Sequence, residues 1–216
     1  MAPGASRVIA QYRQPGLRAR AYMRIRWLVC PFDRVLPLVP REGRLLDVGC
    51  GSGLWLTYLA LERPQLSLHG VDPDARKVAL AGTSALGKIE VRLGSIADVA
   101  EASCDVVTVL DVLCVVPAEA KVDMLRSCYR ALRPGGTLLI KDADTRPWWK
   151  YALMAMEELL AVYVMRMTLG HLKFQSLEAL GRDIESAGFT NVEAARIDRG
   201  YVHPHVVVRA LKPRPT

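Results

Sequence analysis

Three glycines at every second position, Gly49, Gly51 and Gly53, follow a short apolar run. That run, residues 44–48, predicts a buried strand with one carboxylate, Asp47, near its end, and the apolar residues after the glycines predict the start of a helix. Glycine suits this turn because a Cβ would block the turn or collide with a ligand. The pattern therefore predicts a site where a ligand contacts backbone at the edge of an α/β sheet.

The spacing of the glycines argues against a dinucleotide fingerprint. That motif has its third glycine three positions after the second, where this chain has Leu54. Nineteen residues after Gly53, at the end of the next apolar run, stands Asp72. A carboxylate there can accept hydrogen bonds from both ribose hydroxyls of a nucleoside. Strand, glycines, helix, strand and acid in this order are therefore a much stronger signal than glycines alone.

In these residues the chain resembles the class I S-adenosylmethionine-dependent methyltransferases. Residues 47–53 match the first motif of that family and Asp72 its acidic second motif. Residues 106–116 are similar to its fourth-strand motif, and residues 132–140 to its turn into the fifth strand. The resemblance covers residues 43–141 closely. It implies a Rossmann-like, doubly wound α/β sheet of seven strands, mostly parallel with a C-terminal antiparallel hairpin, plus an N-terminal helix and a helical lid between strands five and six.

The resemblance implies S-adenosyl-L-methionine as the cofactor. The glycine turn would position its methionine portion, Asp47 would help to hold the ammonium group, and Asp72 would bind the ribose. The family commonly has an acid after the third strand for the adenine amine, whereas this chain has Ser95 and Ile96 there. The expected cofactor-binding residues are Asp47, Gly49, Cys50, Gly51, Gly53, Asp72, Pro73, Ser95, Ile96 and Leu110.

Two candidate catalytic residues follow predicted strands four and five. Ligand clefts of open α/β sheets lie beyond the carboxyl ends of the strands, which places Asp111 and Asp142 near the cofactor or the acceptor. Many members of the family carry a histidine just after the position of Leu113, whereas this chain has Cys114. No cation flanks that cysteine in the sequence, so we interpret it as an apolar wall residue and not as a tuned thiol.

A long helix is expected over residues 148–169, and it contains four of the seven methionines. Such a helix suits a lid over a hydrophobic acceptor, although a methionine-rich helix is more often ordinary core packing. His171, on the connection after Gly170, is the third candidate catalytic residue, a general base near neutral pH. The candidate acceptor-binding residues are Asp144, Arg146, Trp148, Tyr151 and Tyr22. Asp144 has an alternative role as a helix cap, and two carboxylates two apart are weak evidence for a metal, so no metal site is predicted.

The net charge of +7 lies entirely in residues 1–44, which hold nine arginines against Asp33 and Glu42. Residues 1–16 are expected to be poorly ordered until they meet the body or a partner. Residues 17–30 predict a basic amphipathic helix. It would dock on anionic lipid or an acidic carrier protein, or else pack across the cofactor cleft with its arginines solvated. We therefore divide the chain into an N-terminal arm, residues 1–30, and a methyltransferase domain, residues 31–216.

Composition narrows the class of protein. An apolar content of 51% over 216 residues is typical of one domain with a full core, and no stretch predicts a bilayer span or a secretory signal. Five scattered cysteines without a C-x-x-C pair predict reduced core thiols. We therefore expect a cytoplasmic protein, peripheral at the membrane if the basic arm binds lipid. The sequence indicates no oligomeric state.

The resemblance implies methyl transfer to oxygen or carbon of a small, largely apolar acceptor of secondary metabolism: a lipid, a polyketide-like or aromatic molecule, free or carrier-bound. One alternative is a methyltransferase-fold protein that binds the cofactor without methyl transfer, as a partner subunit or a cyclase. A second is RNA methylation, suggested by the arginine-rich arm. Nucleic acid is the less favoured partner, because no Asn/Asp-Pro-Pro-aromatic tetrapeptide follows strand four.

Overall fold

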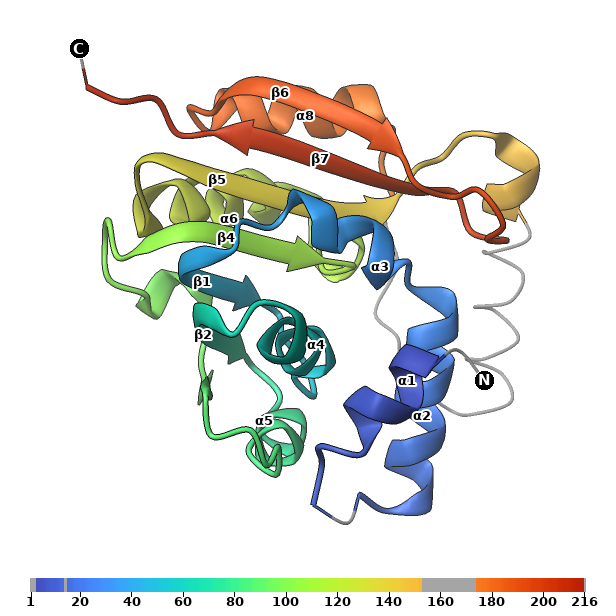
Figure 1. Ribbon diagram of the computed structural model, residues 1–216. Coiled ribbons are helices and arrows are strands. Elements are labelled where there is room, and N and C mark those ends of the chain that lie inside the picture. The colour runs from blue at the N-terminus through green and yellow to red at the C-terminus, as the bar shows by residue number, and fades with distance from the viewer. Residues whose placement is uncertain (1–2, 14, 153–173, 216) are drawn as a thin grey trace.

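The computed structural model describes residues 3–13, 15–152 and 174–215, and a seven-stranded sheet lies at its centre (Figure 1). The strand order is β3-β2-β1-β4-β5-β7-β6. Strands β1 to β5 are parallel, and β7 pairs antiparallel with both β5 and β6. The strands are β1 (Glu42–Val48), β2 (Gln65–Asp72), β3 (Ile89–Leu93), β4 (Cys104–Leu110), β5 (Leu132–Ala143), β6 (Thr190–Arg196) and β7 (His205–Leu211). The predicted mostly parallel sheet with a C-terminal antiparallel hairpin is confirmed.

Helices cover both faces of the sheet (Figure 1). The near face in that view carries α1 (Pro3–Ile9), α2 (Leu17–Val29), α3 (Phe32–Val35) and α4 (Leu54–Glu62). The far face carries α6 (Ala118–Ala131) and α8 (Leu177–Ser186), while α5 (Ala75–Ala81) lies beside β2 and β3. Short 3-10 turns are η1 (Leu36–Leu38), η2 (Ile96–Asp98) and η3 (Leu113–Val115). None of the helices in the described ranges is long and apolar enough to cross a bilayer.

Neighbouring residues of the central strands point into two different cores, because side chains alternate along a strand. Leu45 and Leu139 belong to the core that includes residues of α1 to α4. Leu46 and Leu138 belong to the core that includes residues of α6 and α8. Burial on both faces explains why the sequence of these strands is almost continuously apolar.

The N-terminal arm contributes directly to the first core. Val8 and Tyr12 are buried, and the Tyr12 hydroxyl donates to the Ser52 carbonyl oxygen at 2.9 Å and lies 2.9 Å from the Thr57 hydroxyl. Residues 3–13, expected to order only against the body or a partner, therefore do lie against the body, and they reach the glycine turn.

The ends of three elements have visible causes. Helix α5 ends at Ala81, because the following backbone at residues 83–85 bonds to residues 11–13. Strand β5 starts at Leu132, with a register shift opposite β4. Strand β7 starts only at His205, since residues 198–201 form a turn and Pro204 has no N–H to pair.

Tyr12→Phe should lower the free energy of unfolding by ~1–2 kcal/mol, because two polar groups inside the core lose their hydroxyl partner. Urea unfolding followed by circular dichroism measures the change. Tyr22→Phe is the matched control, since Tyr22 is 46% exposed on α2 and its substitution should change stability by less than ~0.5 kcal/mol. Equal changes in the two variants would contradict the role given to the Tyr12 hydroxyl.

Candidate active site

The turn after β1 leaves main chain bare where a ligand can approach. Gly49 and Gly51 both have positive φ, +69° and +56°, which favours glycine. A Cβ on Gly49 would lie 2.5 Å from a methyl of Val112, so this glycine lets the loop after β4 come close. Among the described residues, only the Lys77 side chain would lie near a Cβ on Gly51, at 4.0 Å. Gly51 thus faces open space that a side chain would begin to fill, as a cradle for a ligand requires.

Asp72, at the end of β2, holds this turn in place. One of its carboxylate oxygens accepts from the Gly51 N–H at 2.8 Å and the other from the Asp74 N–H at 2.9 Å. The side chain is buried, yet each carboxylate oxygen has a second lone pair for a further donor. The residue assigned to the ribose from the sequence therefore also fixes the shape of the turn, which sequence spacing alone did not indicate.

Asp47 is buried at the end of β1, and its Oδ1 accepts from the Thr108 hydroxyl at 2.6 Å. Burial raises the pKa of Asp47 to about 7, and the Thr108 hydrogen bond only partly offsets that rise. A cationic group bound beside it would favour the carboxylate form. This matches the expected role of holding an ammonium group.

A buried ion cluster lies at the carboxyl ends of β4 and β5. Asp111 has φ +55°, and its carboxylate contacts Arg26 of α2 at 2.6 Å and Lys141 of β5 at 2.5 Å. The second Arg26 nitrogen donates to the Leu110 carbonyl oxygen at 3.4 Å. Lys141 is only 1% exposed. The cluster therefore ties α2 to the centre of the sheet.

The charges of this cluster change the role we give to Asp111. Burial alone would raise its pKa, but Lys141 and Arg26 together hold the pKa of this carboxyl well below its usual range. Such a carboxylate is a weak proton acceptor, so we assign Asp111 to positioning and not to general-base chemistry. The expectation that the arginines of residues 17–30 are simply solvated is likewise wrong at Arg26.

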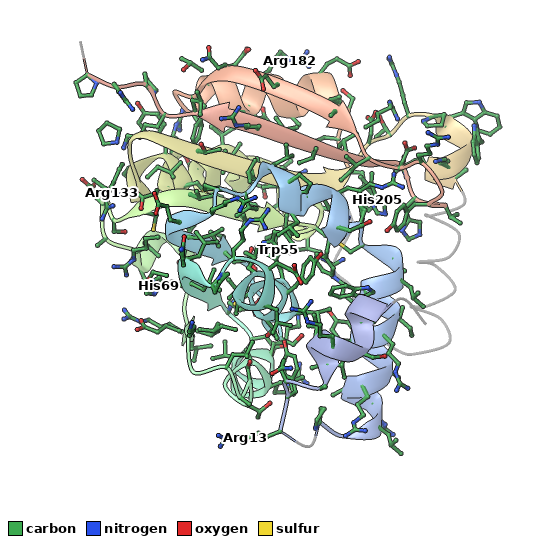
Figure 2. All side chains as sticks on the ribbon, viewed as in Figure 1. Arg13, Trp55, His69, Arg133, Arg182 and His205 are labelled. Carbon is green, nitrogen blue, oxygen red and sulfur yellow. The ribbon has the colours of Figure 1, made fainter. Side chains whose placement is uncertain are left out.

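His205, at the start of β7 (Figure 2), is close enough to this cluster to interact electrostatically with Asp111, which no sequence pattern indicated. Its side chain is buried, and its Nε2 lies 2.8 Å from the Val29 carbonyl oxygen, to which it donates. Burial, and then the charge of Lys141, lower the pKa of His205 to about 3, so the ring is neutral. Its Nδ1 has no hydrogen-bond partner among the described residues. His205 therefore couples β7 to the C-terminal end of α2.

Asp142 lies at the end of β5 and Asp144 directly follows that strand, but the two side chains differ in surroundings. Asp142 is buried and accepts from the Ala143 N–H at 2.8 Å. Burial, and then the charge of Asp111, raise the pKa of Asp142 to about 7. Asp144 is buried too, but it pairs with Arg196 at 2.5 Å and accepts from the Leu177 N–H at the start of α8. We therefore assign Asp144 to the fold and keep Asp142 as a candidate base.

The remaining residues expected at the cofactor lie near the ends of β2 and β3. The Ser95 hydroxyl accepts from the Ala97 N–H and contacts Asp98, so it caps η2. Ile96 is buried in the second core. Pro73 is exposed, directly after Asp72. Cys50 is buried, and burial raises its thiol pKa above its usual range.

Most residues expected to bind the acceptor lie on the surface. Trp148 is 77% exposed, and with Arg146 and Arg196 it lines an open hollow. The Tyr151 ring packs edge-on against Phe174, and Tyr22 is half-exposed on α2. His171 and residues 153–169 of the expected lid helix lie outside the described residues. No group of three or more metal-ligating side chains occurs within the described ranges.

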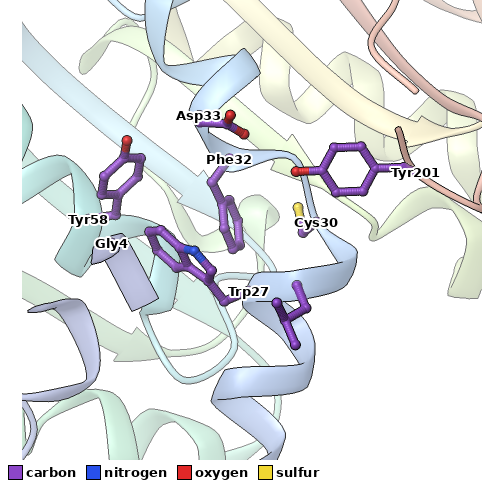
Figure 3. A pocket seen from close by; sticks show the side chains of 8 residues that line it. Gly4, Trp27, Cys30, Phe32, Asp33, Tyr58 and Tyr201 are labelled. Atoms are coloured by element: carbon purple, nitrogen blue, oxygen red, sulfur yellow. The ribbon is translucent and has the colours of Figure 1, made fainter. Parts of the chain in front are cut away.

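A cavity of about 270 Å³ lies between the N-terminal helices and α4 (Figure 3). Its walls are mainly aromatic, and Cys30 separates it from the Asp111 cluster. Burial raises the pKa of the Cys30 thiol to about 11, so the thiol is protonated. Sequence reasoning missed this cavity because its walls come from separate segments. The aromatic residues are Trp27, Phe32, Tyr58 and Tyr201.

Comparison with known proteins adds independent information. A family model described as a methyltransferase domain matches residues 20–194. Ubiquinone biosynthesis O-methyltransferase of Xanthomonas oryzae pv. oryzae is 33% identical over 128 residues, which are 57% of this chain and 51% of that protein. The chain thus spans about half the length of the curated relatives that it matches.

Solved structures agree in fold. The S-adenosylmethionine-dependent methyltransferase SibL in its apo form superposes with a TM-score of 0.73 at 26% identity, covering 97% of this chain and 62% of SibL. Phosphoethanolamine N-methyltransferase 2 of Haemonchus contortus, in complex with S-adenosyl-L-methionine, has a TM-score of 0.61 at 18% identity, covering 85% of this chain and 52% of that one. The second likeness is one of fold alone.

Asp111→Asn should destabilise the protein by ~3–5 kcal/mol, because Arg26 and Lys141 keep their charges while their shared partner is lost. The stabilisation by wild-type Asp111 is present above the pKa of an unfolded Asp, ~3.9, and is lost as the pH falls through the lower folded pKa. Urea unfolding at several pH values measures both effects.

Asp123→Asn is the control for Asp111→Asn, since it breaks a surface pair with Arg126 at 3.0 Å whose side chains are more than half exposed. Its effect should stay below ~1 kcal/mol. An Asp111→Asn protein as stable as the control would show that the buried cluster does not hold α2.

Proposed function

The chain belongs to the S-adenosylmethionine-dependent methyltransferases, and from that premise we propose that it methylates a hydroxyl oxygen of a small, largely apolar acceptor. The observation that carries cofactor binding is the bare backbone of Gly51 beside the buried carboxylate of Asp72. S-adenosyl-L-methionine supplies an electrophilic methyl group on a sulfonium. The protein itself must bind and orient the cofactor and the acceptor, and it must exclude water from them.

The residues at the strand ends suit the parts of the cofactor. Asp72 has lone pairs for two ribose hydroxyls in addition to its two backbone partners. Asp47, whose pKa lies near neutrality, gains a favourable partner in an ammonium group. Gly51 leaves space for the methionine portion against the main chain. Arg26 and Asp111 hold α2 over this end of the sheet, which helps to exclude water.

Three observations support an oxygen of an apolar acceptor. The curated relatives that match at 33% identity are named ubiquinone biosynthesis O-methyltransferases. Asp142 is a buried carboxyl with a pKa of about 7, suited to taking a proton from a hydroxyl near neutral pH. The apolar, methionine-containing sequence of residues 148–169 fits an acceptor of low polarity.

The direct test is product analysis. Purified protein is incubated with S-adenosyl-L-methionine carrying a labelled methyl group and with a panel of alkyl-substituted phenols and catechols. Formation of S-adenosylhomocysteine together with an O-methylated product, identified by mass spectrometry and carbon NMR, supports the proposal. A methyl group on carbon, or methylation of added RNA and of none of the phenols, would overturn it.

Asp72→Ala should weaken binding of S-adenosyl-L-methionine by ~1.5–3 kcal/mol, because the ribose and the Gly51 N–H both lose a charged acceptor. Isothermal titration calorimetry measures this change. Asp74→Ala is the control, as that carboxylate caps α5 through the Arg76 N–H and should leave the affinity near wild type. Unchanged affinity in Asp72→Ala would remove Asp72 from the site.

Asp142→Asn should reduce kcat/KM by ~10²–10⁴-fold, as expected when a general base is lost. In the wild type, kcat/KM should rise with pH and level off above about 7, where the carboxyl has lost its proton. The rise should vanish in Asp142→Asn and persist in Asp142→Glu. An unchanged pH profile in Asp142→Asn would assign the proton transfer to another group.

A further inference from the structure

The outward side of α2 carries an apolar stripe. Leu17, Ile25 and Leu28 are 87%, 56% and 64% exposed. Together with exposed Ala21 they are spaced by four, four and three residues, which places them on one side of a helix. The opposite side carries buried Met23 and points into the core. Helix α2 is therefore apolar on two sides, and only the inward side packs against the rest of the described fold.

Arginines flank this stripe on both sides. Arg18 follows Leu17 on one flank, and Arg20 and Arg24 lie on the other, and all three are exposed. The helix contains no acidic residue. Arg26, by contrast, points inward to Asp111, so the outward arginines are not needed for the cluster. Three of the nine arginines of residues 1–44 therefore flank an exposed apolar stripe.

Two exposed tryptophans follow β5 in the chain. Trp148 and Trp149 are 77% and 49% exposed. The next residue, Lys150, donates to the Tyr201 carbonyl oxygen at 3.0 Å, and Tyr201 lines the aromatic cavity together with Leu28. Tryptophan favours the boundary between lipid headgroups and acyl chains. The tryptophans and Leu28, at the C-terminal end of the stripe, thus border one region.

We propose that the outward face of α2 is a binding surface for an anionic lipid bilayer. The stripe of Leu17, Ile25 and Leu28 enters the headgroup–acyl boundary, and the flanking arginines contact lipid phosphates. A helix that lies flat with cations along both flanks matches a planar anionic surface better than a globular protein partner, which can contact both flanks only by wrapping around the helix. The proposal does not depend on which acceptor is methylated.

The test is flotation of the full chain with vesicles of phosphatidylcholine, with and without phosphatidylglycerol. Wild-type protein should float with the anionic vesicles, and added salt should weaken this binding. Ile25→Glu should weaken it at least tenfold. Leu93→Glu, the matched control at a 60% exposed position on β3, should bind as wild type.

A second pair of variants tests the arginines. Arg18→Gln with Arg24→Gln should weaken binding about fivefold for each arginine and reduce its salt dependence. Arg92→Gln with Arg182→Gln removes the same charge from β3 and from α8, which lies across the sheet from α2, and should have little effect (Figure 2). If both pairs weaken binding equally, net charge and not this face drives the association, which overturns the proposal.

Other outcomes would also overturn it. One is that the wild-type protein does not bind anionic vesicles, or that Ile25→Glu binds them equally well. Another is that the wild-type protein self-associates and Ile25→Glu abolishes the self-association. A third is that the wild-type protein binds a purified acidic carrier protein and not the vesicles. Leu17→Glu distinguishes a loss of lipid binding from a folding defect, because Leu17 is almost fully exposed and its substitution should leave the fold intact. Its circular dichroism spectrum and its affinity for S-adenosyl-L-methionine should match wild type while vesicle binding falls.

Discussion

Four carboxylates end four neighbouring strands of the sheet, and the cost of burying them side by side is the constraint that shapes this end of the molecule. Three of them are buried, and the fourth, Asp111, is largely so. Like charges in a medium of low polarity cannot all remain ionised without compensation. Burial is the main cause of the raised pKa values of Asp47 and Asp142. The charge of Asp72 adds to the rise at Asp47, and that of Asp111 to the rise at Asp142. Each carboxylate is stabilised in a different way.

Because the four carboxylates are stabilised in different ways, they have different roles in the site. Asp72 is satisfied by two backbone N–H groups, so it can shape the glycine turn and still accept from a ligand. Asp111 has two cations and stays ionised, which makes it a tether for α2. Within the part of the chain that the structure describes, Asp47 and Asp142 each accept one hydrogen bond, and their pKa values lie near neutral pH. The latter two are therefore the groups whose charge a bound cation or an acceptor hydroxyl can change.

The sequence allowed the strands and the glycine turn to be predicted because their signals are local. Continuous apolar runs, glycines at fixed spacing and an acid at a strand end all lie within a few residues of one another. Pairings between distant segments carry no such signal. Arg26 meets Asp111, Tyr12 meets Ser52, and Asp144 meets Arg196 only after the chain has folded. For the same reason, the aromatic cavity and the place of His205 were not foreseen.

The basic helix shows why composition alone left two interpretations open. Arginine is suited both to a buried ion pair and to a phosphate-rich surface, and its side chain does not reveal which it meets. In α2 the arginine of the buried ion pair lies on the inward side of the helix, and the arginines of the exposed surface lie on the outward side. The inward Arg26 lies beside Met23 in the core and fixes the helix to the sheet. Because that tether holds the inward side, the outward stripe is presented as a fixed surface and not as part of a flexible tail, so less conformational entropy is lost when a partner binds it.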